Sequence, residues 1–142
     1  MPVRVMQLNE MPKLQKKAVL FTKDSPGTRI VPEVFGASWT SFLQAGLGVI
    51  FILDDFAGAL GAVKMSDPNS GELTATEIFW FTKQSARGRG LRLLRAFEQW
   101  AKRAGCIRLT VAHMADSMPE KVKHVYERRG YSLFETHYAK GI

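Results

Sequence analysis

Two apolar runs near the middle of the chain, joined by a short turn, restrict the fold more than any other feature. Gly48 to Leu53 is a continuous β-branched and aromatic run, and Ala59 to Met65 is a second apolar run. Between them lies Asp54-Asp-Phe-Ala-Gly58, which has the composition of a turn. Runs of this length bounded by turn residues are typical of paired strands. We therefore predict a β-hairpin.

A third strand follows from the residues immediately after the hairpin. Asp67-Pro-Asn-Ser-Gly71 is another tight turn, and it leads into the run Leu73 to Thr82. Because side chains alternate along a strand, Glu77, Phe79 and Phe81 are expected to share one face. The three strands together predict an antiparallel meander.

Helical spacing of apolar residues flanks the meander on both sides. Outside the meander, the predicted elements are a strand Val3 to Leu8, helices Met11 to Phe21, Pro32 to Leu43 and Leu94 to Ala104, a strand Cys106 to His113, a helix opened by the capping box Ser117-Met-Pro-Glu120, and a strand Tyr131 to Tyr138. Glycines 46, 105 and 130 are placed to end three of these helices. The order of elements predicts an α/β (α+β) fold, with a mixed, mainly antiparallel sheet flanked by helices.

Length and cysteine content limit the class of protein. A chain of 142 residues predicts one domain spanning residues 1–142. The single cysteine, Cys106, cannot form an internal disulfide and leaves too few thiolates for a cysteine-rich zinc site, so we expect the reducing cytoplasm and no metal. No apolar stretch approaches the about 20 residues that a membrane-spanning helix needs. We therefore expect a soluble protein with no membrane partner.

The positive charge of the protein is concentrated in one third of the chain. Residues 84–129 hold eleven basic and four acidic side chains, which accounts for the whole net charge of +7. Such a concentration favours an anionic partner: a nucleic acid, a membrane surface or a phosphorylated cofactor. Charge alone does not choose among these three.

The segment Arg87-Gly-Arg-Gly-Leu-Arg92 narrows the choice because of its position between a predicted strand and a predicted helix. Backbone N–H groups converge at such a junction, and glycines let a pyrophosphate approach the main chain. Arginines add charge-assisted donors. The segment is not a Walker loop, because no Gly-Lys-Ser/Thr follows. An ordinary tight turn or an arginine–glycine contact to nucleic acid are the alternative interpretations.

With this loop the sequence resembles the GCN5-related N-acetyltransferase (GNAT) superfamily, from about Gly48 to Tyr131. The family's acetyl-CoA loop, Arg/Gln-x-x-Gly-x-Gly/Ala, is matched by residues 87–92, with Arg92 in place of the last small residue. Tyr126-Glu-Arg-Arg-Gly130-Tyr131 is similar to the signature at the end of the family's last helix. The asparagine that many members carry before that helix is absent, since the region reads Asp116-Ser-Met-Pro119.

The resemblance implies that acetyl-CoA is the acetyl-donor cosubstrate. It implies a splayed pair of parallel strands, Leu73 to Thr82 and Cys106 to His113, with the pantetheine arm between them. The implied cofactor-binding residues are Phe81, Thr82, Arg87, Gly88, Arg89, Gly90, Leu91 and Arg92. The phosphates of coenzyme A would then account for the concentrated positive charge, so nucleic acid is not the expected partner.

Acetyl transfer to an amine requires a group that removes a proton, because an unperturbed amine of pKa about 10.4 is protonated at neutral pH. Glu77 lies in an apolar strand where several family members place this base, and burial there would raise its pKa. A solvent-facing or arginine-paired carboxylate is the alternative for Glu77. His113 competes as base because of its ordinary pKa of about 6.5, with a surface or capping histidine as its alternative.

Tyr126 matches the family tyrosine that protonates the departing thiolate, although it also lies on the apolar stripe of its helix and so fits a core tyrosine. The thioester oxygen would meet main-chain N–H groups near Thr82. Trp39 and Phe42 are candidates for the wall of the acceptor site. Twelve residues follow Gly130, fewer than the family's usual last two strands need, so the acceptor site is expected to be open or completed by a second subunit of a homodimer.

These observations favour an N-acetyltransferase that acts on a primary amine of a small molecule or a protein by direct attack in a ternary complex. Two alternatives remain at this point. One is a CoA-binding or protein-interaction module without catalysis, and the other is a small basic nucleic-acid-binding protein.

Overall fold

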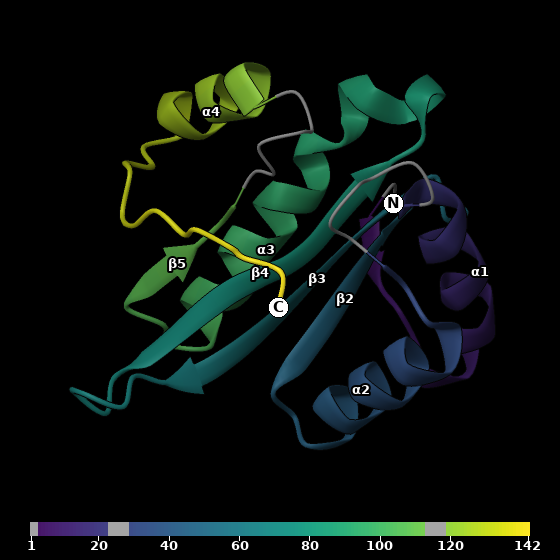
Figure 1. The fold of residues 1–142 in the computed structure, drawn as a ribbon, viewed down its shortest axis with the longest axis horizontal. Helices are drawn as coiled ribbons and strands as arrows, with labels where there is room; N and C mark the ends of the chain where they lie inside the picture. The colour runs from purple at the N-terminus through teal and green to yellow at the C-terminus, as the bar shows by residue number, and fades with distance from the viewer. Residues whose placement is uncertain (1–2, 23–28, 113–118) are drawn as a thin grey trace. The chain divides into compact units, whose positions relative to one another are not determined.

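The computed structural model describes residues 3–22, 29–112 and 119–142 (Figure 1). The chain forms two compact units, Met1–Val111 and Ala112–Ile142, and each is described by itself. None of the helices in the described residues is long and apolar enough to cross a membrane.

The first unit is built on a five-stranded sheet in the order β1-β2-β3-β4-β5. The strands are β1 (Val3–Val5), β2 (Gly48–Leu53), β3 (Gly58–Ser66), β4 (Leu73–Thr82) and β5 (Arg108–Thr110). β1 to β4 pair in antiparallel fashion, and β4 pairs with β5 in parallel. The predicted meander is therefore confirmed, with the bounds of β2 and β4 as predicted.

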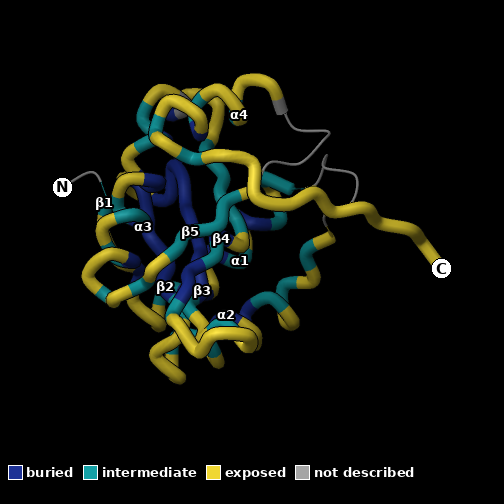
Figure 2. Tube along the Cα trace, turned by 90° about the vertical axis from the view of Figure 1, so that its left-hand side faces the viewer, coloured by how far each residue is buried: buried dark blue, intermediate teal, exposed yellow. Residues whose placement is uncertain are grey.

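Helices cover both faces of this sheet. α1 (Met11–Thr22) and α2 (Pro32–Gln44) pack on one face, where Leu14 and Trp39 join Ile50 and Ile52 in one buried cluster. The neighbouring residues of the same strands point the other way, and there α3 (Leu91–Arg103) contacts β1, β2 and β3. The strands between the helices are the buried, dark blue part of the trace in Figure 2. The core is thus a sheet enclosed by two helical layers.

The second unit contains α4 (Pro119–Arg128), which ends as its sequence predicts. Gly130 has a φ of +90°, the Tyr131 N–H donates to Tyr126 O at 3.0 Å, and the Gly130 N–H donates to Glu127 O at 3.1 Å. This is a Schellman motif, in which a glycine takes the left-handed position after the helix. The same pair of bonds closes α3 at Gly105, with a φ of +85°. The start of the predicted capping box lies outside the described residues.

Four expectations about secondary structure need correction, and the first is that β5 covers only Arg108–Thr110 of the predicted strand Cys106 to His113. β1 is only three residues long and is followed by a 3-10 turn, η1 (Leu8–Glu10), and residues 84–89 form a 3-10 helix, η2 (Gln84–Arg89), rather than an open loop. Tyr131 to Tyr138 forms no strand. Its alternating sequence suits a strand, but a strand requires a pairing partner, and Leu133 and Tyr138 are instead 87% and 94% exposed (Figure 2).

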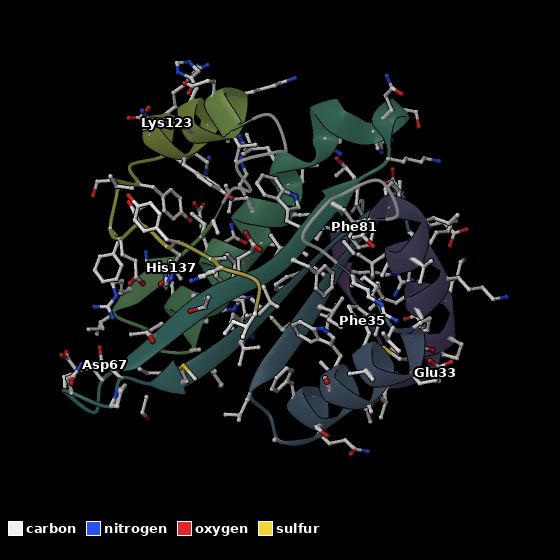
Figure 3. The ribbon with its side chains drawn as sticks, in the orientation of Figure 1. Glu33, Phe35, Asp67, Phe81, Lys123 and His137 are labelled. Carbon is white, nitrogen blue, oxygen red and sulfur yellow. The ribbon has the colours of Figure 1, made fainter. Side chains whose placement is uncertain are left out.

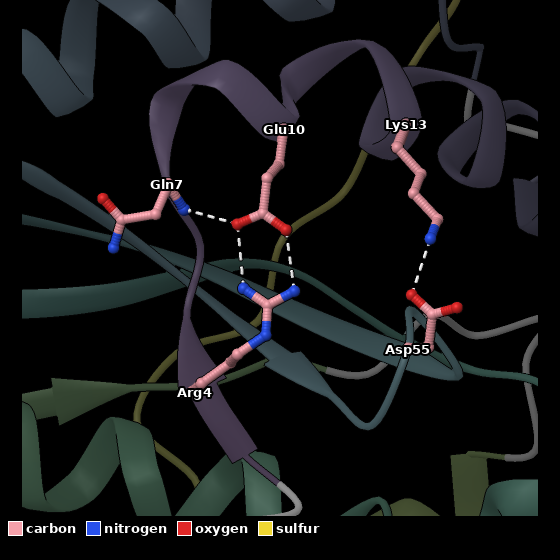
Figure 4. Close-up of polar contacts among 5 residues, drawn as sticks. All are labelled: Arg4, Gln7, Glu10, Lys13 and Asp55. Carbon is pink, nitrogen blue, oxygen red and sulfur yellow. Dashed lines mark hydrogen bonds and ion pairs between the residues drawn. The ribbon is translucent and has the colours of Figure 1, made fainter.

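An ion pair fixes the short edge strand β1 (Figure 4). The Arg4 guanidinium donates two hydrogen bonds to the Glu10 carboxylate, at 2.8 and 2.7 Å, and the Gln7 N–H donates a third at 2.9 Å. These bonds hold the pKa of Glu10 down at about 2. Nearby, Lys13 of α1 pairs with Asp55 of the β2–β3 turn at 2.6 Å.

Because the pKa of Glu10 is lower in the folded chain, its carboxylate stabilises the fold above the ordinary carboxyl pKa, and this contribution disappears as pH falls through about 2. The pair is at the surface, so the stabilisation is on the order of 1 kcal/mol. We expect Glu10→Gln to lower the urea midpoint at pH 7 and to match the wild type near pH 2. A difference that persisted unchanged at pH 2 would contradict this origin.

Candidate active site

The candidate site lies at the point where the pairing between the parallel strands β4 and β5 ends. β4 pairs with β5 at Thr74↔Arg108, Ala75↔Leu109 and Thr76↔Thr110, and there the pairing ends. β4 itself continues to Thr82, bonded to β3 on its other side. Among the described residues, no strand therefore lies beside residues 77–82 on the β5 side. The parallel pairing is thus confirmed, whereas the expected splay between Leu73 to Thr82 and Cys106 to His113 stays a prediction, because residues 113–118 lie outside the described part of the structure. A strand edge without a neighbouring strand suits a ligand with amide groups.

A β-bulge in β4 corrects the expectation about Glu77. Glu77 lies opposite Ala62 while Phe79 lies opposite Gly61, so that Ile78 is an extra residue. Cross-strand partners share a face, and the adjacent residues Gly61 and Ala62 point to opposite faces. Glu77 therefore does not share the face of Phe79 and Phe81, as the simple alternation predicted. It lies on the α3 face of the sheet.

The Glu77 side chain is buried there. Its residue is 9% exposed, which makes it the most deeply buried carboxylate among the described residues. Glu77 also takes part in at least one hydrogen bond, ion pair or other electrostatic interaction. A carboxylate held at a fixed position in an apolar strand, one residue beyond the last β4–β5 pair, has the burial that a general base needs.

The face of Phe79 and Phe81 is an aromatic wall shared with α1 and α2 (Figure 3). Phe81 stacks on Phe21 of α1 with ring centroids 4.6 Å apart, and on Phe79 at 5.7 Å. Phe79 also contacts Phe35 of α2 at 5.6 Å. Neither Phe21 nor Phe35 was predicted as a site residue, although both lie in predicted helices and are apolar. Trp39, expected at the acceptor site, is 3% exposed and belongs to the core.

The predicted phosphate loop leads directly from β4 into α3. Gly90 is the N-cap of α3, in helical conformation with φ −59° and ψ −26°, and no side chain caps the helix. A Cβ added at Gly88 would meet no atom within 4 Å, so the chain is open in front of this residue. Uncapped N–H groups at a helix start are donors for an anion. The start of α3 at Gly90 and Leu91, directly after η2, is therefore the candidate anion site of this segment.

The arginines of this segment differ in what they contact. Arg89 forms an ion pair with Asp54 of the β2–β3 turn, which ties the loop to the sheet. Arg92 is exposed and lines a cavity beside β1. The backbone of Arg87 lies in η2, and its side chain is outside the described part of the structure. The ion pair of Arg89 could not be foreseen, because Asp54 is distant in sequence.

The remaining candidates, Tyr126 and His113, belong to the second unit. The hydroxyl of Tyr126, a residue 6% exposed, donates to the main-chain oxygen of Ala112 at 2.7 Å, and its ring lies 5.6 Å from that of Tyr131. This is the contact expected of a buried tyrosine with a satisfied hydroxyl. His113 lies outside the described residues. Cys106, in the first unit, is half-buried, and burial raises the pKa of its thiol.

Comparisons with known proteins agree with this arrangement. The model of the Acetyltransferase (GNAT) family matches residues 20–131. The chain therefore belongs to the GNAT acetyltransferase family. No curated protein matches the sequence.

Solved structures show the same fold at low sequence identity. A probable acetyltransferase superposes with a TM-score of 0.79 at 18% identity, over 100% of this chain and 98% of that one. A GNAT family acetyltransferase of Staphylococcus aureus subsp. aureus USA300_TCH1516 has a TM-score of 0.71 at 17% identity, over 99% and 97%. An aminoglycoside acetyltransferase from an uncultured soil metagenomic sample has a TM-score of 0.75 at 14% identity, over 99% and 97%.

Proposed function

We propose that this protein is an acetyl-CoA-dependent N-acetyltransferase that acts on a primary amine, with residues 1–142 working as one domain. The observation that carries the proposal is the end of the β4–β5 pairing at Thr76↔Thr110, while β4 continues to Thr82 and is connected through η2 to the start of α3. An open strand edge and a helix N-terminus that follow one another in the chain suit the two parts of coenzyme A, its amide-containing arm and its pyrophosphate.

When bound, acetyl-CoA supplies an acetyl group activated as a thioester. The N–H groups of Gly88, Gly90 and Leu91 bind the pyrophosphate, and the open edge of β4 near Phe81 and Thr82 orients the amide arm. Main-chain N–H groups near Thr82 stabilise the negative charge that develops on the thioester oxygen.

Glu77 is the proposed general base. Its burial beside the last β4–β5 pair supports this role, because a carboxylate removed from water holds a proton more readily than an exposed one. Tyr126 is the proposed donor of a proton to the departing thiolate, a role in which its hydroxyl exchanges the bond to Ala112 for one to sulfur. His113 remains the competing base.

The acetyl group passes directly to the amine in this proposal. A covalent acetyl-cysteine intermediate would need a reactive thiolate, and Cys106 is the protein's only cysteine. Because burial raises the pKa of its thiol, Cys106 is a poor nucleophile at neutral pH. The proposed acceptor is a primary amine of a small molecule or a protein.

Substitution of Gly88 tests coenzyme binding without disturbing the fold. We expect Gly88→Val to weaken acetyl-CoA binding by about a hundredfold or more in calorimetry, since the added side chain would occupy the open space in front of the loop. The melting temperature should change little, because the new Cβ meets no protein atom within 4 Å.

Gly141→Val is the matched control, because a Cβ at that position also meets nothing within 4 Å. It should bind acetyl-CoA like the wild type. Unchanged binding by Gly88→Val would contradict the proposed pyrophosphate site. Binding of acetyl-CoA without transfer to any amine of a broad panel would instead identify a CoA-binding module.

A further inference from the structure

A positively charged cavity lies at the β1 edge of the sheet. This is the opposite edge from β5, where the β4–β5 pairing ends. The cavity, of about 320 Å³, is formed between the edge strand β1 and α3. Its apolar part includes Val3 and Val5 of the edge strand β1 and Phe51 of the adjacent strand β2. A volume of this size is within the range of about 300–1,000 Å³ that small-molecule sites have.

One side of the cavity is a row of basic side chains on α3. Arg92, Arg95, Gln99 and Arg103 recur at helical spacing, so they lie along one face of the helix, and all four line the cavity. From Arg92 to Arg103 the row advances by eleven residues, about 16 Å of helix at about 1.5 Å per residue. The cavity is therefore an elongated, positively charged groove.

The charge of this row is not neutralised by neighbouring acids. No acidic residue is among those that line the cavity, and no ion pair involves Arg92, Arg95 or Arg103 in the part of the chain that the structure describes. Arg4 also lines the cavity, but its guanidinium is already held by Glu10. Three guanidinium groups with exposed side chains thus remain available in one groove.

We propose that this groove between β1 and α3 is a binding site for a small molecule that carries two or more phosphate groups, separate from the proposed coenzyme site. Guanidinium groups suit phosphate because they donate two parallel hydrogen bonds to it. The apolar floor of Val3, Val5 and Phe51 suits a ligand with an organic body. The limited volume of about 320 Å³ favours such a ligand over nucleic acid, which binds broad basic surfaces.

The test uses inorganic triphosphate as the probe and the full chain as the protein. Calorimetry is done at constant ionic strength, without coenzyme A and with coenzyme A at saturation. We expect saturable binding in both cases, and a rise in melting temperature with triphosphate. The double variant Arg95→Ala, Arg103→Ala should bind triphosphate at least tenfold more weakly. It should keep the affinity for acetyl-CoA.

Lys102→Ala is the matched control, because Lys102 is an exposed cation on the same last turn of α3 but does not line the cavity. It should bind triphosphate within about twofold of the wild type, because screened surface charges act weakly at a distance. An equal loss of triphosphate affinity in the control and in the double variant would show that the probe is attracted by general surface charge. That result would overturn the proposal.

Two further outcomes would also overturn it. Competition between coenzyme A and triphosphate would place the probe in the coenzyme site. Binding of a short DNA duplex more tightly than triphosphate, lost in the double variant, would assign the groove to nucleic acid. The titration without coenzyme A does not depend on acetyltransferase activity. If the proposed activity fails, the binding of triphosphate to this groove is still tested.

Discussion

Replacement of Glu77 by glutamine is expected to lower kcat by about 10²–10⁴-fold, the usual contribution of a positioned general base. The amide keeps the shape of the buried side chain but cannot accept the proton of the amine. The dissociation constant for acetyl-CoA should stay within about twofold of the wild-type value, because the proposed coenzyme contacts are made by the main chain around Gly88 and Thr82.

The pH profile separates a catalytic from a structural role for Glu77. The wild-type kcat should fall on the acid side as the carboxylate takes up a proton, and this limb should be missing in Glu77→Gln. Glu72→Gln is the control, since Glu72 is an exposed carboxylate just before β4. Wild-type turnover in Glu77→Gln, with an unchanged acid limb, would transfer the role of base to His113 or another group.

The second large effect is expected on stability, at Gly61 of β3. An added Cβ there would lie 2.2 Å from Cε2 of Phe79, far inside van der Waals contact. The Phe79 ring cannot move away freely, because it is packed against Trp39 at 5.2 Å, Phe35 at 5.6 Å and Phe81 at 5.7 Å. We expect Gly61→Ala to destabilise the fold by about 3 kcal/mol, the upper part of the range for overpacked cores.

Urea denaturation of Gly61→Ala measures this effect, with Gly88→Ala as the control because its Cβ meets no atom within 4 Å. The double variant Gly61→Ala, Phe79→Leu should be less destabilised than the sum of the two single variants, since the smaller side chain removes the clash. Strict additivity of the two changes would show that the ring and the glycine do not interact as the structure indicates.

The position of Glu77 shows what the sequence could and could not predict about the site. The sequence marked Glu77 as an isolated carboxylate in an apolar strand, and this residue is buried. Alternation along the strand nevertheless placed it on the face of Phe79, which is wrong, because a bulge at Ile78 reverses the alternation. Nothing in the residues 75–81 alone identifies the bulge, which depends on pairing with Gly61 and Ala62 of β3.

The basic residues between positions 84 and 129 also show what could and could not be predicted from the sequence. Composition locates their charge, and the family resemblance assigns this charge to the phosphates of coenzyme A. In the structure Arg89 pairs with Asp54, while Arg92, Arg95 and Arg103 line a groove against β1. These partners lie more than thirty residues away in the chain, so charge patterning along α3 could not separate the arginines by function.

Local features of the sequence by themselves determined the strands of the meander, the helices and the ends of α3 and α4. Their causes act over a few residues: the period of apolar side chains and the left-handed conformation that glycine adopts at Gly105 and Gly130. Only the tertiary structure decided where the β4–β5 pairing stops, which face carries Glu77, and that Tyr131 to Tyr138 stays without a strand partner. Those outcomes depend on contacts between distant segments, because a backbone hydrogen bond or a buried face exists only when its partner is in place.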